Sequence, residues 1–118
     1  PEENLRLRGG SQLLTLDNES YLAVVHETDI EKADIFNRKT LSSTTDIRKY
    51  YHRFARYSSE GVLSGVSDRF KFNGFHIEFA AGIVVKNDSV AISYGVNDMV
   101  SMLGTIDLSK VLELIKDV

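Results

Sequence analysis

The chain has no cysteine among its 118 residues, which excludes disulfides, thiolate metal sites and cysteine nucleophiles. No apolar run approaches the roughly 20 residues of a membrane span, and the first residues do not have the pattern of a signal peptide. The 14 basic and 17 acidic residues are mixed along the chain, so no nucleic-acid or acidic-membrane surface is expected. We therefore expect a cytoplasmic protein or a piece of a larger one, with no nucleic-acid or membrane partner. Neither a cofactor nor a metal is expected, because the histidines lack the short spacing of a zinc site.

The longest apolar stretch, residues 75–103, organises the rest of the chain. Alternate positions from 77 to 85 fall on one face of a strand, and both faces are mostly apolar, which is typical of a strand covered on two sides. A polar turn at residues 86–89 then leads into a return strand at residues 90–95, so the pair predicts a hairpin. At this length the chain forms one domain at most and buries roughly two-thirds of its unfolded surface.

Two further hairpins are expected, because alternating apolar residues flank polar turns. Residues 107–118 are expected to form a closing helix with Asp107 as its N-cap and Lys116 near its C-terminal end. The strand pairs of the two hairpins are 11–16 with 21–26, and 50–57 with 62–66.

Two segments have weaker patterns. Residues 1–10 are polar and end in two glycines, so they predict a flexible lead-in to a folded region of residues 11–118. Residues 28–49 are polar with few apolar anchors, and we expect a long mobile connection there that is functional or disordered, with a helical turn at residues 30–36.

The corner after the return strand is the first candidate site. Tyr94 and Gly95 end the strand, and Asn97 and Asp98 follow, which places a carboxylate at a tight turn beside an aromatic ring. Asp98 fits an acceptor for sugar hydroxyls, and its alternative role is an Asx-turn carboxylate that bonds its own backbone. Three other residues also have two possible roles. His26 is either a site residue or a strand-end histidine bonded to backbone, and Arg53 either binds an anion or is simply exposed to solvent. Glu78 is either a buried, paired carboxylate or a carboxylate that is not buried.

Strand ends with chemically capable residues recur at residues 21–27 and 92–98, as in the repeated units of a β-propeller. At about 40 to 50 residues per blade the chain holds two to three blades, too few to close a ring. The fold class predicted is therefore all-β, with antiparallel hairpins that form part of a β-propeller and a C-terminal helix.

Three segments resemble, in order and spacing, the C-terminal part of the five-bladed propeller of glycoside hydrolase family 130, the β-mannoside phosphorylase family. Within this group, the sequence of these segments looks closer to the related propellers attached to bacterial glycosyltransferases. The segments are YLAVVHE (21–27), YHRFARYSS (51–59) and FAAGIVVKNDSVAISYGVNDMVSMLGTIDLSKVL (79–112).

The resemblance implies that His26 and Tyr51 correspond to phosphate-site residues and that Asp98 corresponds to an acid that holds the sugar. Glu27 replaces a glycine of the family pattern, and its negative charge disfavours inorganic phosphate beside it. The family's catalytic acid lies in an earlier blade without a counterpart here, so the resemblance implies no glycosidase or phosphorylase activity of this chain alone. The substrate-binding residues expected are His26, Glu27, Tyr51, Arg53, Tyr94, Asn97 and Asp98.

The sequence thus predicts a carbohydrate-linked propeller portion that binds or processes a glycan within a larger protein. The alternative is a non-catalytic structural or protein-interaction module. Because two to three blades leave apolar sheet surfaces uncovered, we also expect self-association through open sheet edges. The alternatives are docking on missing N-terminal blades, or folding into a compact sandwich capped by the helix of residues 108–118.

Overall fold

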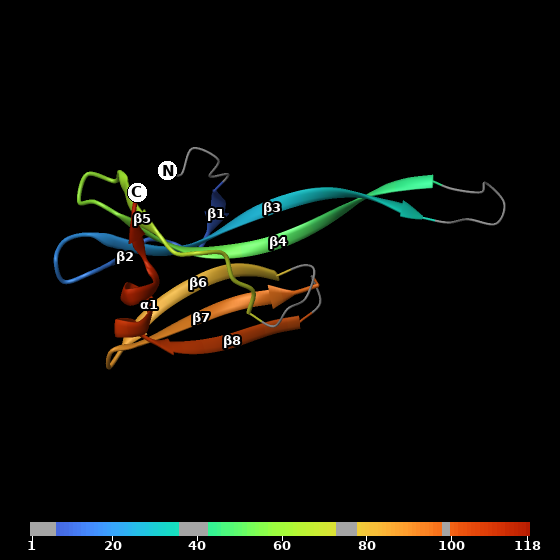
Figure 1. Cartoon of the computed structure of the whole chain (residues 1–118). Coiled ribbons are helices and arrows are strands. Elements are labelled where there is room, and N and C mark those ends of the chain that lie inside the picture. The colour runs from blue at the N-terminus through green and yellow to red at the C-terminus, as the bar shows by residue number, and fades with distance from the viewer. Residues whose placement is uncertain (1–6, 36–42, 73–77, 98–99) are drawn as a thin grey trace.

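Two antiparallel sheets and one short helix make up the computed structural model (Figure 1), which describes residues 7–35, 43–72, 78–97 and 100–118. Sheet A comprises β1 (Arg8–Gly10), β2 (Leu14–Thr15), β3 (Tyr21–Ile35), β4 (Ser43–Tyr57), β5 (Leu63–Val66) and β9 (Lys116–Asp117). Sheet B comprises β6 (Glu78–Lys86), β7 (Ser89–Val96) and β8 (Val100–Asp107), and α1 (Leu108–Leu114) follows it. The antiparallel all-β class with one C-terminal helix is as predicted.

The main core lies between the two sheets. Period-two alternation along β3 and β4 turns Leu22, Val24 and Phe54 toward sheet B, and these residues are at most 3% exposed. The residues that meet them from sheet B, α1 and the segment after α1 are Ala80, Ile83, Val90, Ile92, Val111 and Ile115. A smaller cluster of Ala23, Val25, Ala55 and Val66 lies on the other face of sheet A.

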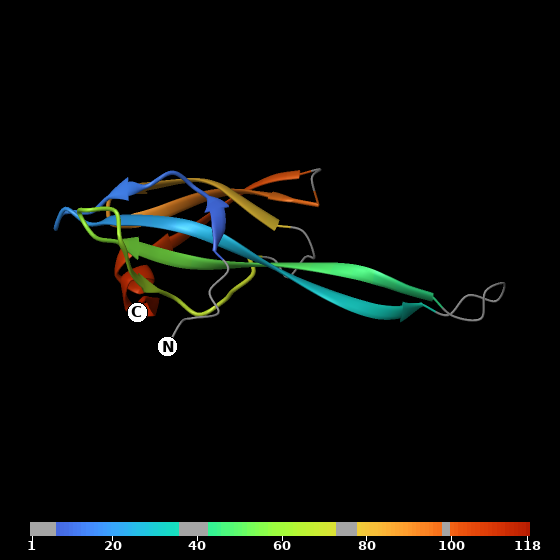
Figure 2. The same ribbon diagram turned by 90° about the horizontal axis from the view of Figure 1, so that it is seen from above.

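The hairpin of β3 and β4 is the longest feature of the fold. All fifteen residues of each strand pair, from Tyr21 opposite Tyr57 to Ile35 opposite Ser43. Beyond the body of the molecule the two strands continue alone as an arm (Figure 2), and the molecule measures 60 × 33 × 19 Å along its principal axes.

The predicted mobile connection at residues 28–49 is therefore wrong for the described residues 28–35 and 43–49, which are strand. The predicted helical turn at residues 30–36 is wrong for residues 30–35, and residue 36 lies outside the described residues. The physical reason is that no glycine or proline interrupts residues 28–57, so the ladder begun in the body continues outward.

The predicted short hairpins are confirmed, although the first strand covers only residues 14–15 of the predicted 11–16, and residue 77 of the predicted central strand lies outside the described residues. Asn87 and Asp88 join β6 to β7 with φ of 51° and 62°, the left-handed pair that a two-residue hairpin loop requires. β2 pairs with β3, and β4 pairs with β5.

Both ends of the chain differ from expectation. The helix begins after Asp107 as predicted, but it ends at Leu114 instead of continuing to residue 118. Ile115 is 8% exposed in the core with an extended backbone, and the next two residues pair with β5 as β9. Lys116 is therefore not at a helix end but forms an ion pair with Asp68. Of the predicted lead-in, residues 8–10 form β1 against β3, and residues 1–6 lie outside the described residues.

Candidate functional site

The register of β3 and β4 decides which of the predicted site residues can meet. Glu27 lies opposite Tyr51, and Arg53 lies opposite Val25, all on the face of sheet A that points away from sheet B. His26 lies opposite His52 on the other face, toward sheet B. His26 and Tyr51 therefore do not share a surface.

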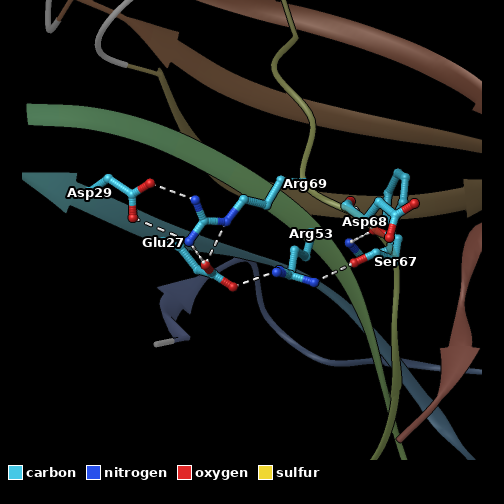
Figure 3. A network of polar contacts seen from close by, with 7 residues as sticks. Glu27, Asp29, Arg53, Ser67, Asp68 and Arg69 are labelled. Atoms are coloured by element: carbon cyan, nitrogen blue, oxygen red, sulfur yellow. Dashed lines mark hydrogen bonds and ion pairs between the residues drawn. The ribbon is translucent and has the colours of Figure 1, made fainter. Parts of the chain in front are cut away.

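Glu27 is the centre of a polar cluster (Figure 3). Its side chain is fully buried, and its Oε1 lies 2.6 Å from Nε of Arg53 in an ion pair that lacks the alignment of a hydrogen bond. Its Oε2 accepts hydrogen bonds from Nε of Arg69, at 2.8 Å, and from Nη2 of Arg69. Arg69 also donates to Asp29, with Nη1 at 2.6 Å from Oδ2. We call Glu27, Asp29, Arg53 and Arg69 the Glu27 cluster.

The remaining contacts of the cluster fix both guanidinium groups. Arg53 Nη1 donates to the carbonyl oxygen of Ser67 at 3.0 Å. The guanidinium of Arg69 lies 5.0 Å from the ring centroid of Tyr51, and Nζ of Lys71 lies 5.1 Å from the same centroid. The hydrogen bonds that Arg69 donates to Asp29 raise its pKa above the ordinary value, and those that it donates to Glu27 add a smaller increase. Because Glu27 is fully buried and doubly paired, it acts by holding Arg69 and Arg53 rather than by touching a ligand.

His52 and His26, on the face of sheet A toward sheet B, pack among core residues. Nε2 of the fully buried His52 accepts the N–H of Ala80 at 3.1 Å, so Nδ1 carries the proton of the neutral ring. Burial lowers the pKa of His52 to about 4; nearby Glu78 opposes this shift, and His26 adds to it. The ring of His26 packs edge-on against Phe79 at 5.7 Å. His52 is therefore neutral at pH 7 and belongs to the core.

The other predicted site residues lie apart from the Glu27 cluster. Tyr94 is 6% exposed and stacks on Phe72 with ring centroids 4.2 Å apart, so it is a core residue and presents little surface to a ligand. Asn97 is exposed in the turn after β7 with φ of 51°, and Asp98 lies outside the described residues. Glu78 is buried and accepts the N–H of Phe72 at 2.8 Å, which confirms the buried, paired alternative.

An open cleft of about 610 Å³ lies beside the Glu27 cluster, between the segment after β5, the edge strand β8 and the end of α1. Arg69 belongs to both the cleft and the cluster. The residues that line the cleft are Phe54, Ser67, Asp68, Arg69, Phe70, Phe72, Ile92, Gly104, Thr105, Ile106, Glu113, Leu114 and Lys116.

The cleft has an aromatic floor and a charged rim. The rings of Phe70 and Phe72 meet edge-on at 5.3 Å, and both side chains are half-buried. At the rim, Nζ of Lys116 lies 3.3 Å from Asp68, and both side chains are mostly exposed. Glu113 is exposed and makes no polar side-chain contact with any other described residue. The sequence analysis missed the charged rim, because its members are far apart in the chain: Asp68 and Lys116 are 48 residues apart.

Comparison with family models, with curated proteins and with solved structures gives no match. The resemblance to glycoside hydrolase family 130 therefore remains a prediction. No helix of the described residues is long and apolar enough to cross a membrane, and no group of three or more His, Asp or Glu among them could hold a metal ion.

Proposed function

We propose that this chain binds a glycan and that a sugar ring occupies the cleft between β8 and the segment after β5. The observation that carries the proposal is the combination of an aromatic floor with a charged rim in one open cleft. The C–H face of a pyranose packs on an aromatic ring, while its hydroxyl groups exchange hydrogen bonds with charged side chains.

The rim supplies both kinds of hydrogen-bond partner. Asp68 and Glu113 accept bonds from sugar hydroxyls, and Lys116 donates to them. Arg69 has five N–H donors, and its contacts with Glu27 and Asp29 are four hydrogen bonds, so one donor remains. In this proposal Glu27 positions Arg69 and does not touch the sugar. This role explains why Glu27, which the sequence predicts to bind substrate, is buried.

We also propose that the two sheets are neighbouring blades of a β-propeller, and two features of the fold support this. Sheet B and the β2–β5 portion of sheet A are each a run of consecutive antiparallel strands, and the two sheets pack face to face, as neighbouring blades do. The crystal structure of a longer protein that contains this chain would test this. Sheets A and B in adjacent blades around a common axis are the expected result, and a separate two-sheet body is the contrary one.

Isothermal titration with mannose, β-mannobiose and a set of nucleotide sugars tests the binding proposal. We expect heat of binding for at least one sugar and a dissociation constant at least tenfold weaker in Glu113→Gln, because a carboxylate bond to a hydroxyl is replaced by a weaker neutral one. Glu60→Gln is the matched control, since Glu60 is exposed in the β4–β5 turn, outside the cleft. Its affinity should equal that of the parent chain.

Two outcomes would contradict the proposal. Absence of binding across the whole panel would end the glycan hypothesis. Binding that Asp98→Ala removes and Glu113→Gln leaves unchanged would move the sugar from the cleft to the strand-end corner predicted from the sequence.

A further inference from the structure

The outer face of sheet B, which points away from the core, is almost free of charge. Solvent-facing sides of antiparallel sheets normally carry polar and charged side chains. Here Val84 is 54% exposed and Leu103 is 70% exposed. Between the β6–β7 turn and the irregularity of β6 at residues 80–82, three rows of residues cross the face, each with one residue from β6, β7 and β8: Lys86, Ser89 and Asp107; Val84, Ala91 and Thr105; Gly82, Ser93 and Leu103.

The rows are complementary in size and charge from one edge strand to the other. In the end row, β6 supplies Lys86 and β8 supplies Asp107. In the third row, β6 supplies a glycine at position 82, and β8 supplies the protruding Leu103. The middle strand carries only Ser89, Ala91 and Ser93 in these rows.

Neither charge of the end row has a side-chain partner among the residues that the structure describes. Asp107 stands at the N-cap of α1 but makes no side-chain capping hydrogen bond. Among the described residues, Lys86 and Asp107 make no ion pair or side-chain hydrogen bond. The structure therefore presents two opposite charges on the same face without a partner for either.

We infer that a second copy of this chain covers the outer face of sheet B, with a twofold axis that runs along β7. Such an axis places β6 over β8 of the second copy and keeps the rows in register. Lys86 then faces Asp107 of the second copy, and Leu103 fills the space over Gly82 of the second copy. The small side chains of β7 let the sheets approach to the usual spacing of about 10 Å.

The free edge of sheet B at β6 is a poorer place for self-association than this face. The side-chain amide of Gln12 donates to the carbonyl oxygen of Ile83 and accepts its N–H at 3.2 Å, so it occupies the hydrogen-bonding groups that an added strand would use. The sequence predicted self-association through open sheet edges; Gln12 blocks this at the β6 edge, and our inference places the contact on the face instead.

The area of the outer face of sheet B sets the expected affinity of the dimer. Three strands about 4.8 Å apart, each of about eight residues at about 3.4 Å per residue, give roughly 400 Å² per copy. A standard stable interface buries about 800 Å² per partner. The dimer should therefore be weak and depend on concentration.

Sedimentation equilibrium of the 118-residue chain from about 10 µM to about 1 mM tests the inference. The expected result is a mass that rises from the monomer value of 13.2 kDa toward twice that value. Lys86→Asp and Asp107→Lys should each weaken the dimer at least tenfold, and the double variant should restore it because the pair is reversed. Lys110→Glu is the charge control, since Lys110 is exposed on α1 and does not belong to the strand rows of this face.

The apolar contact has its own test. Leu103→Asp should abolish the dimer, whereas Val62→Asp, which changes a residue 61% exposed in the β4–β5 turn, should leave it intact. Far-UV circular dichroism verifies that each variant is folded. A monomer at about 1 mM would overturn the inference. So would a dimer that survives Leu103→Asp, or single charge reversals that the double variant does not rescue. Failure here leaves the glycan proposal standing, because the two surfaces are tested by different variants and different readouts.

Discussion

Replacing Glu27 by glutamine removes a buried negative charge while keeping the side-chain volume. The change leaves the Arg53 guanidinium, 15% exposed, without its carboxylate, while Arg69 keeps its bonds to Asp29. Breaking one partner of a buried ion pair typically costs about 3–5 kcal/mol of folding free energy. Because Arg53 keeps the carbonyl of Ser67 and Arg69 is one-third exposed, we expect the lower end, about 3 kcal/mol.

Thermal and urea unfolding measure this loss. Unfolding entropy of about 2.1 cal/mol/K per residue gives about 0.25 kcal/mol/K for a chain of 118 residues, so Glu27→Gln should lower Tm by about 12 °C. Asp29→Asn is the matched control, because Asp29 pairs with the same Arg69 but is 35% exposed. Exposed pairs contribute about 1 kcal/mol or less, so this variant should lose at most about 4 °C.

A second variant separates the ion pair from the fold. Glu27→Met combined with Arg53→Met replaces both charges by apolar side chains, and such replacements are often neutral or stabilising. The double variant should therefore be more stable than Glu27→Gln. The reasoning is refuted if Glu27→Gln lies within about 1 kcal/mol of the parent chain, or if Asp29→Asn loses as much stability as Glu27→Gln.

The remaining predictions concern pH, backbone packing and the arm. Because the pKa of His52 is about 4 in the folded chain against about 6.5 unfolded, the unfolded chain binds more protons, and stability present above pH 6.5 is lost as the pH falls toward 4. Urea unfolding should show a loss of about 2 kcal/mol from this group by about pH 5, and equal pH dependence in His52→Gln would contradict it. Gly10→Ala should destabilise by about 1–3 kcal/mol, because its Cβ would lie 2.1 Å from the carbonyl oxygen of Val24, whereas Gly9→Ala, with nothing within 4 Å, should be neutral in the same unfolding assay. Hydrogen exchange should protect amides of residues 28–35 and 43–49 by virtue of the β3–β4 ladder, and exchange at the unfolded rate would instead support the mobile connection predicted from the sequence.

Much of the fold could be predicted because its rules are local. Polar turns between alternating strands identified the short hairpins, as at Asn87 and Asp88, where the turn geometry needs residues that accept positive φ. The apolar spacing after Asp107 gave the start of α1. The β3–β4 arm was missed because polar strands without an apolar face carry no periodic signal, although residues 28–57 contain no glycine or proline to stop a ladder.

The sequence by itself determined that Glu27, Tyr51 and Arg53 are chemically capable and that Tyr51 and Arg53 fall on one face of a strand, because alternation along a strand depends only on backbone geometry. Only the tertiary structure decided that His26 lies on the opposite face of sheet A from Tyr51 and Arg53. It also decided that Glu27 is fully buried and that its partner is Arg69, 42 residues away. Period-two alternation says which residues share a face, but not which face another sheet covers. That choice depends on how β3 and β4 pair and on how sheet B packs against them, and both are contacts between segments far apart in the chain.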